Sequence, residues 1–271
     1  MKKDVTKKHI FVTGAASGIG RATAKDFAAM GHTVYAIDVK MPEYIDGAMC
    51  FAADIRNESE LTKIKRELSE KNVEIDAIVC IAGVHTMAAL AESDFADIKR
   101  VIDINLLGTM LTVRVFHTLL APGGRVVIVT SEVATYTPMP FNGLYSVSKT
   151  ALDCYADALR QELNLLGQKV VAVRPGAVAT PLAFSSADTT EILAEKTELY
   201  RNESRHFASL VKKFTGTPLP PEKMAKTVCK AVLTKHPRLA YSKHRNIGLV
   251  LLSILPKRLQ CAMIKSLLKR K

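Results

Sequence analysis

Short apolar runs rich in β-branched residues alternate with longer helical patterns along most of this 271-residue chain. Seven candidate strands follow from this pattern, at 9–13, 33–38, 48–53, 75–81, 125–130, 169–174 and 238–241. Most of them are nearly continuous in apolar residues, which is typical of parallel strands covered on both faces. The candidate helices are 18–30, 57–72, 93–120, 144–166 and 222–234. Such alternation predicts right-handed crossovers and an α/β fold with a doubly wound parallel sheet.

The positive charge of the chain is concentrated at its C-terminal end. The formal net charge is +12, yet residues 1–222 contain 25 basic and all 26 acidic residues. Residues 223–271 contain 13 basic residues and no acid. We therefore expect a nearly neutral body and a basic tail, and the partners of the tail have to be considered separately.

The cysteines predict a reducing compartment. The count of five is odd, and no two cysteines are spaced like zinc ligands, so we expect free thiols and no metal site. The apolar run at 10–12 is far too short for a secretory signal. We therefore expect a cytoplasmic protein.

A glycine-rich turn connects the first strand to the first helix. Gly14 permits a tight turn, Gly18 allows the backbone to approach a pyrophosphate, and Gly20 permits close packing of helix and strand. The N-terminus of the following helix offers unpaired N–H groups to phosphate oxygens. The segment therefore predicts a dinucleotide site, with a ligand-free glycine turn as the alternative.

Asp38 ends the second strand, 18 residues beyond Gly20. A carboxylate at this point accepts hydrogen bonds from the ribose hydroxyls of the adenosine and repels a 2′-phosphate. Ser17 is not basic, so the glycine turn offers no compensating cation, although Lys40 is near. The sequence favours NAD over NADP. The alternative is that Asp38 merely ends its strand in a turn.

Tyr145 and Lys149 are four residues apart and share one face if the segment is helical. A free tyrosine has a pKa of about 10 and is a poor base at neutral pH. A neighbouring cation lowers that pKa, which makes proton transfer near pH 7 feasible. The alternative is a chance pair on a solvated helix face.

Further motifs occur in an order that resembles the short-chain dehydrogenase/reductase family over residues 8–240. They are the glycine spacing of 14–20, Asp54-Ile55, Ile81-Ala82-Gly83, Asn105 to Gly108, Ser131 before Tyr145 and Lys149, and Arg174 to Thr180. Ile81 stands where the family usually has asparagine. The resemblance implies a Rossmann-type sheet of about seven strands in the order 3-2-1-4-5-6-7, with helices on both faces. It also implies one domain over residues 1–245, and a member similar to hydroxysteroid dehydrogenases.

The resemblance implies a role for each matching residue. Tyr145 would be the general acid/base, Lys149 would lower its pKa and bind the nicotinamide ribose, and Ser131 would hold the substrate oxygen. Asn105 would interrupt its helix and hold a water. The implied cofactor-binding residues are Gly14, Ser17, Gly18, Ile19, Gly20, Asp38, Asp54, Ile55, Ala82, Gly83, Tyr145, Lys149, Pro175, Gly176, Val178 and Thr180.

Two points near the site stay open in the sequence. Ser131 precedes Tyr145 by 14 residues, one more than is usual in the family, and Thr130 also carries a hydroxyl. We select Ser131 because it lies beyond the apolar run 126–129 with the expected parity. His85, Met87, Met139 and Phe141 are expected either to line a substrate pocket or to pack in the core.

The region 181–217 is expected to form a lid over the site. Its candidate apolar wall residues are Leu182, Phe184, Ile192, Leu193, Leu199, Tyr200 and Phe207. The resemblance implies a secondary alcohol or ketone as substrate, and because similar enzymes of steroids or retinoids are membrane-associated, a basic tail such as this one favours a lipophilic molecule, such as a hydroxysteroid. The alternatives are a 3-oxoacyl or sugar-alcohol substrate, or a non-catalytic protein that binds a cofactor and a membrane. The resemblance implies a homodimer or homotetramer that pairs through 93–120 and 144–166.

The tail, 246–271, is predicted to form a basic amphipathic helix from Pro256 onward. Leu255, Leu259, Met263 and Leu267 share one face, flanked by Lys257, Arg258, Lys265, Lys269 and Arg270. Such a helix suits peripheral contact with an anionic membrane. The alternative is packing on its own or a partner subunit. We expect no nucleic-acid partner, because the basic residues interleave with aliphatic ones.

Overall fold

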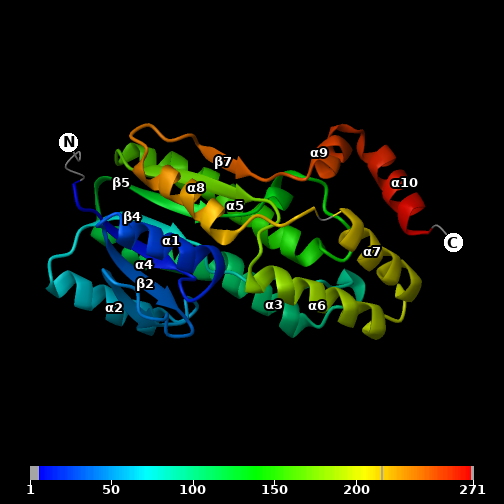
Figure 1. The fold of residues 1–271 in the computed structure, drawn as a ribbon, viewed down its shortest axis with the longest axis horizontal. Helices are drawn as coiled ribbons and strands as arrows, with labels where there is room; N and C mark the ends of the chain where they lie inside the picture. The colour runs from blue at the N-terminus through cyan, green and yellow to red at the C-terminus, as the bar shows by residue number, and fades with distance from the viewer. Residues whose placement is uncertain (1–5, 215, 270–271) are drawn as a thin grey trace.

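The computed structural model describes residues 6–214 and 216–269 and contains a seven-stranded sheet in the order β3-β2-β1-β4-β5-β6-β7 (Figure 1). The strands are β1 His9–Thr13, β2 Thr33–Asp38, β3 Ala48–Ala52, β4 Ile75–Cys80, β5 Leu120–Val129, β6 Lys169–Pro175 and β7 Ala240–Lys243. Every pairing between neighbouring strands is parallel. The predicted Rossmann-type topology is confirmed.

Helices cover both faces of the sheet. Alternate residues of each strand point to opposite sides, so each face presents apolar side chains to the helices that cover it. On one face, Ile10 and Val12 of β1 pack with α1 (Gly18–Ala29) and α8 (Pro221–Leu233). On the other face, Phe11 packs with a second group of helices. This group comprises α2 (Glu58–Glu70), α4 (Gly108–Phe116) and α5 (Gly143–Leu165). Figure 1 shows α1 and α8 on one side of the sheet and α4 and α5 on the other.

The continuous helix predicted over 93–120 is wrong. The segment forms α3 (Phe95–Ile102), a π-helical turn at Asp103–Leu107, and then α4. A short 3-10 turn follows, and β5 already begins at Leu120. π-helical turns inside helices often occur at functional sites, and this one contains the buried Asn105.

The C-terminal half adds four helices beside the sheet. The predicted lid region forms α6 (Pro181–Lys196) and α7 (Arg201–Phe214), and the tail forms α9 (Ile247–Ile254) and α10 (Lys257–Leu268). Figure 1 shows α9 and α10 at the same end of the molecule as α7. Within the described ranges, no helix combines the length and the apolar character needed to cross a bilayer.

Glu92 holds the turn between the two lid helices. Its carboxylate accepts hydrogen bonds from the Thr197 hydroxyl and, at 2.9 and 3.0 Å, from the backbone N–H groups of Glu198 and Leu199. The first of these bonds is the main reason that the pKa of Glu92 is lowered. The loop after β4 is thereby tied to the predicted lid region.

Candidate active site

A cavity of about 700 Å³ opens at the carboxyl ends of the central strands, where doubly wound sheets usually bind their ligands. With the exception of Asn105, every residue predicted for catalysis or cofactor binding lines this cavity. The fold thus collects residues that are spread from Gly14 to Thr180 in the sequence. Their individual roles stay predictions.

The glycine turn forms a close-fitting cradle at one end of the cavity. Gly14 has a φ of +72°, and a Cβ there would lie 2.8 Å from the backbone nitrogen of Ala82. A Cβ on Gly20 would lie 1.9 Å from the carbonyl oxygen of Gly14. The Ser17 side chain makes no capping hydrogen bond at the start of α1, so the first amides of the helix are available to phosphate oxygens. The shape and donors of this cradle fit a pyrophosphate.

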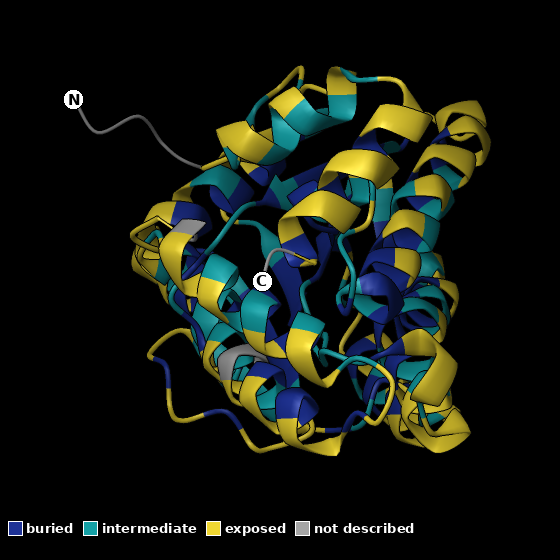
Figure 2. Ribbon diagram, turned by 90° about the vertical axis from the view of Figure 1, so that its right-hand side faces the viewer, coloured by how far each residue is buried: buried dark blue, intermediate teal, exposed yellow. Residues whose placement is uncertain are grey.

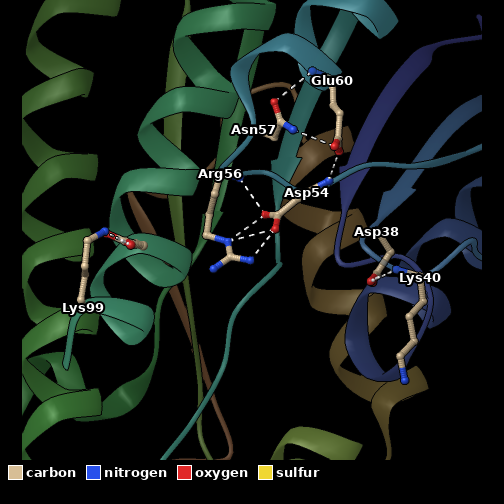
Figure 3. A network of polar contacts seen from close by, with 8 residues as sticks. Asp38, Lys40, Asp54, Arg56, Asn57, Glu60 and Lys99 are labelled. Carbon is tan, nitrogen blue, oxygen red and sulfur yellow. Dashed lines mark hydrogen bonds and ion pairs between the residues drawn. The ribbon is translucent and has the colours of Figure 1, made fainter. Parts of the chain in front are cut away.

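Asp38 lies at the end of β2 and is bonded to the glycine turn. Its Oδ2 accepts from the Ala16 N–H at 3.0 Å and its Oδ1 from the Lys40 N–H at 3.3 Å. Figure 3 shows the Lys40 side chain extending away from this carboxylate. Asp38 therefore presents negative charge to the cavity.

Arg56 is a cavity-lining residue that the sequence prediction missed. Its Nε lies 3.0 Å from both carboxylate oxygens of Asp54, and these contacts, visible in Figure 3, are the main reason that the pKa of Asp54 is lowered. The backbone N–H of Asp54 in turn donates to Glu60 Oε2 at 2.7 Å. Asp54 and Ile55 line the cavity as predicted, but the Asp54 carboxylate is already paired. The sequence signal that could have identified Arg56 is its position two residues after Asp54, where the two side chains can form an ion pair.

Asn105 braces the π-helical turn against the loop after β4. Its Oδ1 accepts from the Val84 N–H at 2.7 Å, and its Nδ2 donates to the Val84 carbonyl and to Ser148 Oγ, both at 2.9 Å. Ser148 lies in α5 directly before Lys149. The interruption of the helix at Asn105 was predicted, and these bonds give it a physical cause. Asn105 is fully buried beside the cavity and does not line it.

Ile81 stands at the position where an asparagine was expected, and the Thr13 side chain makes the hydrogen bonds to the loop after β4. The Thr13 hydroxyl accepts from the backbone N–H groups of Ile81 and Ala82, at 3.1 and 3.3 Å. The Ile81 side chain packs against the apolar cluster on the α1 and α8 face. The end of β4 is thus connected to β1 without an asparagine side chain.

Thr130 and Ser131 turn in different directions, which separates the two candidate hydroxyls. The Thr130 hydroxyl donates to Asp153 Oδ1 at 3.0 Å. The Ser131 hydroxyl accepts from the Val133 N–H at 3.3 Å and lies close enough to Tyr145 to act on the pKa of its phenol. Both residues line the cavity, and Ser131 is the one that interacts with Tyr145.

Tyr145 is partly buried in the cavity wall, and loss of hydration raises its pKa to about 12 although the neighbouring Ser131 side chain opposes the shift. Burial also lowers the pKa of Lys149 to about 8. The Lys149 ammonium donates to the Val129 carbonyl at 3.1 Å and lies 5.8 Å from the centre of the tyrosine ring. In the protein without a cofactor, loss of hydration therefore sets the direction of the tyrosine pKa, which is opposite to the lowering expected from Lys149.

His85 packs on the face of Tyr145, with the ring centres 4.1 Å apart. One ring nitrogen lies 2.7 Å from Asn142 Oδ1, and burial lowers the pKa of the imidazole, so the ring is neutral at pH 7. His85 and Met87 line the cavity, whereas Met139 and Phe141 pack in an apolar cluster beneath the lid. Of the predicted lid residues, Leu182 and Phe184 line the cavity, Leu193, Tyr200 and Phe207 join that cluster, and Ile192 and Leu199 are exposed.

We expect Lys149→Met to stabilise the fold while it abolishes turnover. The pKa of Lys149 is about 8 when folded and 10.5 in the reference state, so the ammonium disfavours the folded state by about 3 kcal/mol at pH 7. Because the folded pKa is the lower one, this penalty is complete below about pH 8 and fades as the pH rises towards about 10.5. Urea unfolding at about pH 7 and about pH 10 measures the difference.

Lys25→Met is the matched control, because Lys25 is an exposed lysine of helix α1. It should change the free energy of unfolding by less than about 0.5 kcal/mol at either pH. A Lys149→Met protein that is no more stable than wild type at pH 7 would contradict a buried, destabilising ammonium.

Comparisons with known proteins agree with this geometry. Residues 8–191 match the family model described as short chain dehydrogenase. The chain is 25% identical over 229 residues to the 3-ketodihydrosphingosine reductase of Bacteroides thetaiotaomicron, a match that covers 84% of each. It is 32% identical over 197 residues to the glucose 1-dehydrogenase of Gluconobacter oxydans, covering 68% of this chain and 74% of that one. A short-chain dehydrogenase from Streptomyces avermitilis shares the fold, with a TM-score of 0.77 at 20% identity and 98% coverage of both chains.

Proposed function

Because this chain belongs to the short-chain dehydrogenase family, and is therefore an oxidoreductase of alcohols and ketones that binds a nicotinamide dinucleotide, we propose that it uses NAD(H) and acts on a lipophilic secondary alcohol or its ketone. One observation carries the proposal. Tyr145 and Ser131 line the same cavity as the glycine turn and Asp38, and Ser131 lies close enough to Tyr145 to act on the pKa of its phenol. We further propose that residues 1–245 form one domain, with 181–217 as its lid.

The cavity residues divide the chemistry between them. Tyr145 takes the hydroxyl proton in alcohol oxidation and returns it in ketone reduction. Ser131 holds the substrate oxygen and stabilises the charge that builds on it. Lys149 holds the nicotinamide ribose and adds positive charge near the phenol. A nicotinamide held there would supply the hydride acceptor or donor, and the positive charge of its oxidised form would favour the phenolate.

His85 and Asn105 support this arrangement from outside the reacting atoms. His85 is neutral at pH 7, and its ring lies against the Tyr145 ring, so it restricts the phenol without competing for the proton. Asn105 fixes the backbone of Val84 and the hydroxyl of Ser148, which lies next to Lys149. We also propose that Asn105 holds a water on the path from Lys149 to solvent.

Asp38 supports NAD over NADP. Its carboxylate is held at the cavity edge by the Ala16 and Lys40 amides, where it would accept bonds from the ribose hydroxyls and repel a 2′-phosphate. Arg56 is the cation that lines this end of the cavity, and its guanidinium is paired with Asp54. That pairing reduces the charge it can offer to a phosphate.

The substrate end of the cavity supports a lipophilic molecule. The lining of the whole cavity is mainly apolar, and it includes Met87, Leu182, Phe184 and Val211. The relatives named above are a reductase of 3-ketodihydrosphingosine and a dehydrogenase of glucose, so membership of the family leaves both lipid and sugar substrates open. We propose the lipophilic class, with hydroxysteroids as one example. A 3-oxoacyl or sugar-alcohol substrate is the second candidate.

A substrate panel tests this function. NADH or NADPH formation is measured with steroid, retinoid, acyl and sugar alcohols, each with both cofactors. We expect turnover of lipophilic secondary alcohols with NAD. Turnover confined to sugar alcohols would replace the substrate class. NAD binding without turnover of any alcohol or ketone would favour the non-catalytic alternative.

Assembly and location follow as finer proposals. Large exposed side chains lie on the helices that are expected to pair, with Phe95, Val147 and Leu165 exposed by 76%, 53% and 86%. These support a homodimer or homotetramer. All five cysteines are free, which supports a cytoplasmic location. Peripheral membrane contact through 246–271 is argued next.

A further inference from the structure

Helix α9 is apolar in sequence, yet none of its residues is buried. It reads Ile-Gly-Leu-Val-Leu-Leu-Ser-Ile from Ile247 to Ile254. Ile247, Leu251 and Ile254 are exposed by 74%, 61% and 74%, and their spacing places them on one face. A helix that is apolar all round normally lies in a protein core or in lipid. Leu252 packs against the apolar cluster that contains Phe207, whereas Ile247, Leu251 and Ile254 belong to none of the apolar clusters of the described residues.

Helix α10 presents two different faces. Gln260, Ile264 and Leu268 are buried, and the latter two belong to the apolar cluster that contains Phe207 of α7. The face predicted from the sequence is instead exposed, with Leu259, Met263 and Leu267 exposed by 46%, 40% and 39%. The tail therefore packs on its own subunit through one stripe and leaves the neighbouring apolar stripe open.

These exposed residues lie at one end of the molecule, and we call them the tail face: Ile247, Leu251, Ile254, Leu259, Met263 and Leu267. Figure 1 shows α9 and α10 as consecutive helices beside α7, and Figure 2 views the molecule from this end. Three of the six side chains are exposed by more than half. A cluster of this kind usually marks an interaction surface.

Positively charged side chains flank the tail face in the sequence of the tail. Arg258, Lys265 and Lys269 are exposed and form no ion pair among the described residues. Residues 223–271 contain no acid, and the predicted flanking residue Arg270 lies outside the described ranges. A second copy docked by two-fold symmetry would bring these cations together. An anionic lipid surface would neutralise them and accept the apolar side chains.

We propose that the tail face docks on an anionic membrane surface, with its apolar side chains at the headgroup boundary and its cations against lipid phosphates. The opposite stripe of α10 packs with α7, and Val211 of α7 lines the cavity. Docking therefore sets the lid beside the bilayer. This consequence deepens the proposed function and rests on it, because a lipophilic substrate partitions into the same layer.

The test is cosedimentation of the full-length protein with phosphatidylcholine vesicles, with and without phosphatidylglycerol. We expect binding to the anionic vesicles and its loss at high salt. Leu251→Gln, Leu259→Gln and Met263→Gln together should weaken binding by about tenfold or more. Each cation removed, in Arg258→Gln, Lys265→Gln or Lys269→Gln, should weaken it by about fivefold.

A matched control carries Met30→Gln, Met41→Gln and Leu239→Gln, three exposed apolar residues outside the tail, and should bind like wild type. Light scattering of each variant reports its oligomeric state. The proposal is wrong if the wild-type protein does not bind anionic vesicles. If, in addition, the tail-face variant forms a smaller assembly than wild type, the tail face is a subunit interface. Vesicle binding needs no turnover, so an inactive protein that still binds would contradict the proposed function alone.

Discussion

Tyr145→Phe is expected to lower kcat by about 10²–10⁴-fold, the range of general acid–base catalysis, and to leave NAD affinity nearly unchanged. The substitution removes the phenol oxygen that lies next to Ser131. It keeps the ring that packs on His85 at 4.1 Å and leaves Lys149 bonded to the Val129 carbonyl. Steady-state oxidation of the best alcohol of the panel, together with NADH binding followed by fluorescence, measures both quantities.

Tyr136→Phe provides the matched control for this loss. Tyr136 is also buried, and its hydroxyl accepts from Arg245 Nε at 2.7 Å, but it does not line the cavity. The same chemical change there should leave kcat close to wild type. A Tyr145→Phe enzyme with full activity would show that the proton is transferred by another group.

Asp38→Ser is expected to reverse the cofactor preference. A hydrogen bond to a charged group contributes about 1.5–3 kcal/mol, so loss of the ribose contacts should weaken NAD binding by about 10–100-fold. Removal of the carboxylate charge should strengthen NADP binding, because its 2′-phosphate is no longer repelled. The ratio of kcat/KM for the two cofactors measures the reversal.

Asp38→Asn separates charge from shape at the same position. It keeps an acceptor for the Ala16 amide, which bonds Asp38 at 3.0 Å, but it carries no charge. NADP should improve in this variant as well, and NAD should lose less than in Asp38→Ser. Asp46→Asn, at an exposed site outside the cavity, should change neither cofactor. An unchanged preference in both Asp38 variants would show that another group selects the cofactor.

The sheet could be predicted because parallel strands buried on both faces have a local signature. Strands such as Val126–Val129 are nearly continuous in β-branched residues, and the crossover rule then restricts the topology. The break between α3 and α4 was implied by the family resemblance at Asn105 but not by the periodicity of 93–120, which predicted one continuous helix. It depends on Asn105 bonding to Val84, 21 residues earlier in the chain, and no local pattern encodes such a contact.

The choice between Thr130 and Ser131 depended on parity along one strand, and the structure supports it. Thr130 is drawn to Asp153, whereas Ser131 begins the next turn beside Tyr145. The pKa of Tyr145 could not be predicted from its spacing to Lys149. Burial of both groups acts against charge on either one, and only the packed structure reveals that burial.

The tail shows how a helical pattern can be ambiguous. Its sequence contains two neighbouring apolar stripes. The buried stripe is not recognised as apolar in the sequence because the polar Gln260 belongs to it. Gln260 is accommodated because it bonds to the Thr137 hydroxyl and donates to the Ser253 carbonyl at 3.4 Å. The predicted stripe of Leu259, Met263 and Leu267 is therefore the one left for a partner.

The most direct test of hydride transfer uses a hydroxysteroid that carries deuterium at its carbinol carbon. It is incubated with the enzyme and NAD, and the reduced cofactor is examined by mass spectrometry. The account predicts that wild type places the deuterium on the nicotinamide ring and that Tyr145→Phe does so at a rate lower by about 10²–10⁴-fold. NAD bound without any deuterium transfer, from this alcohol or from deuterated members of the rest of the panel, would contradict it.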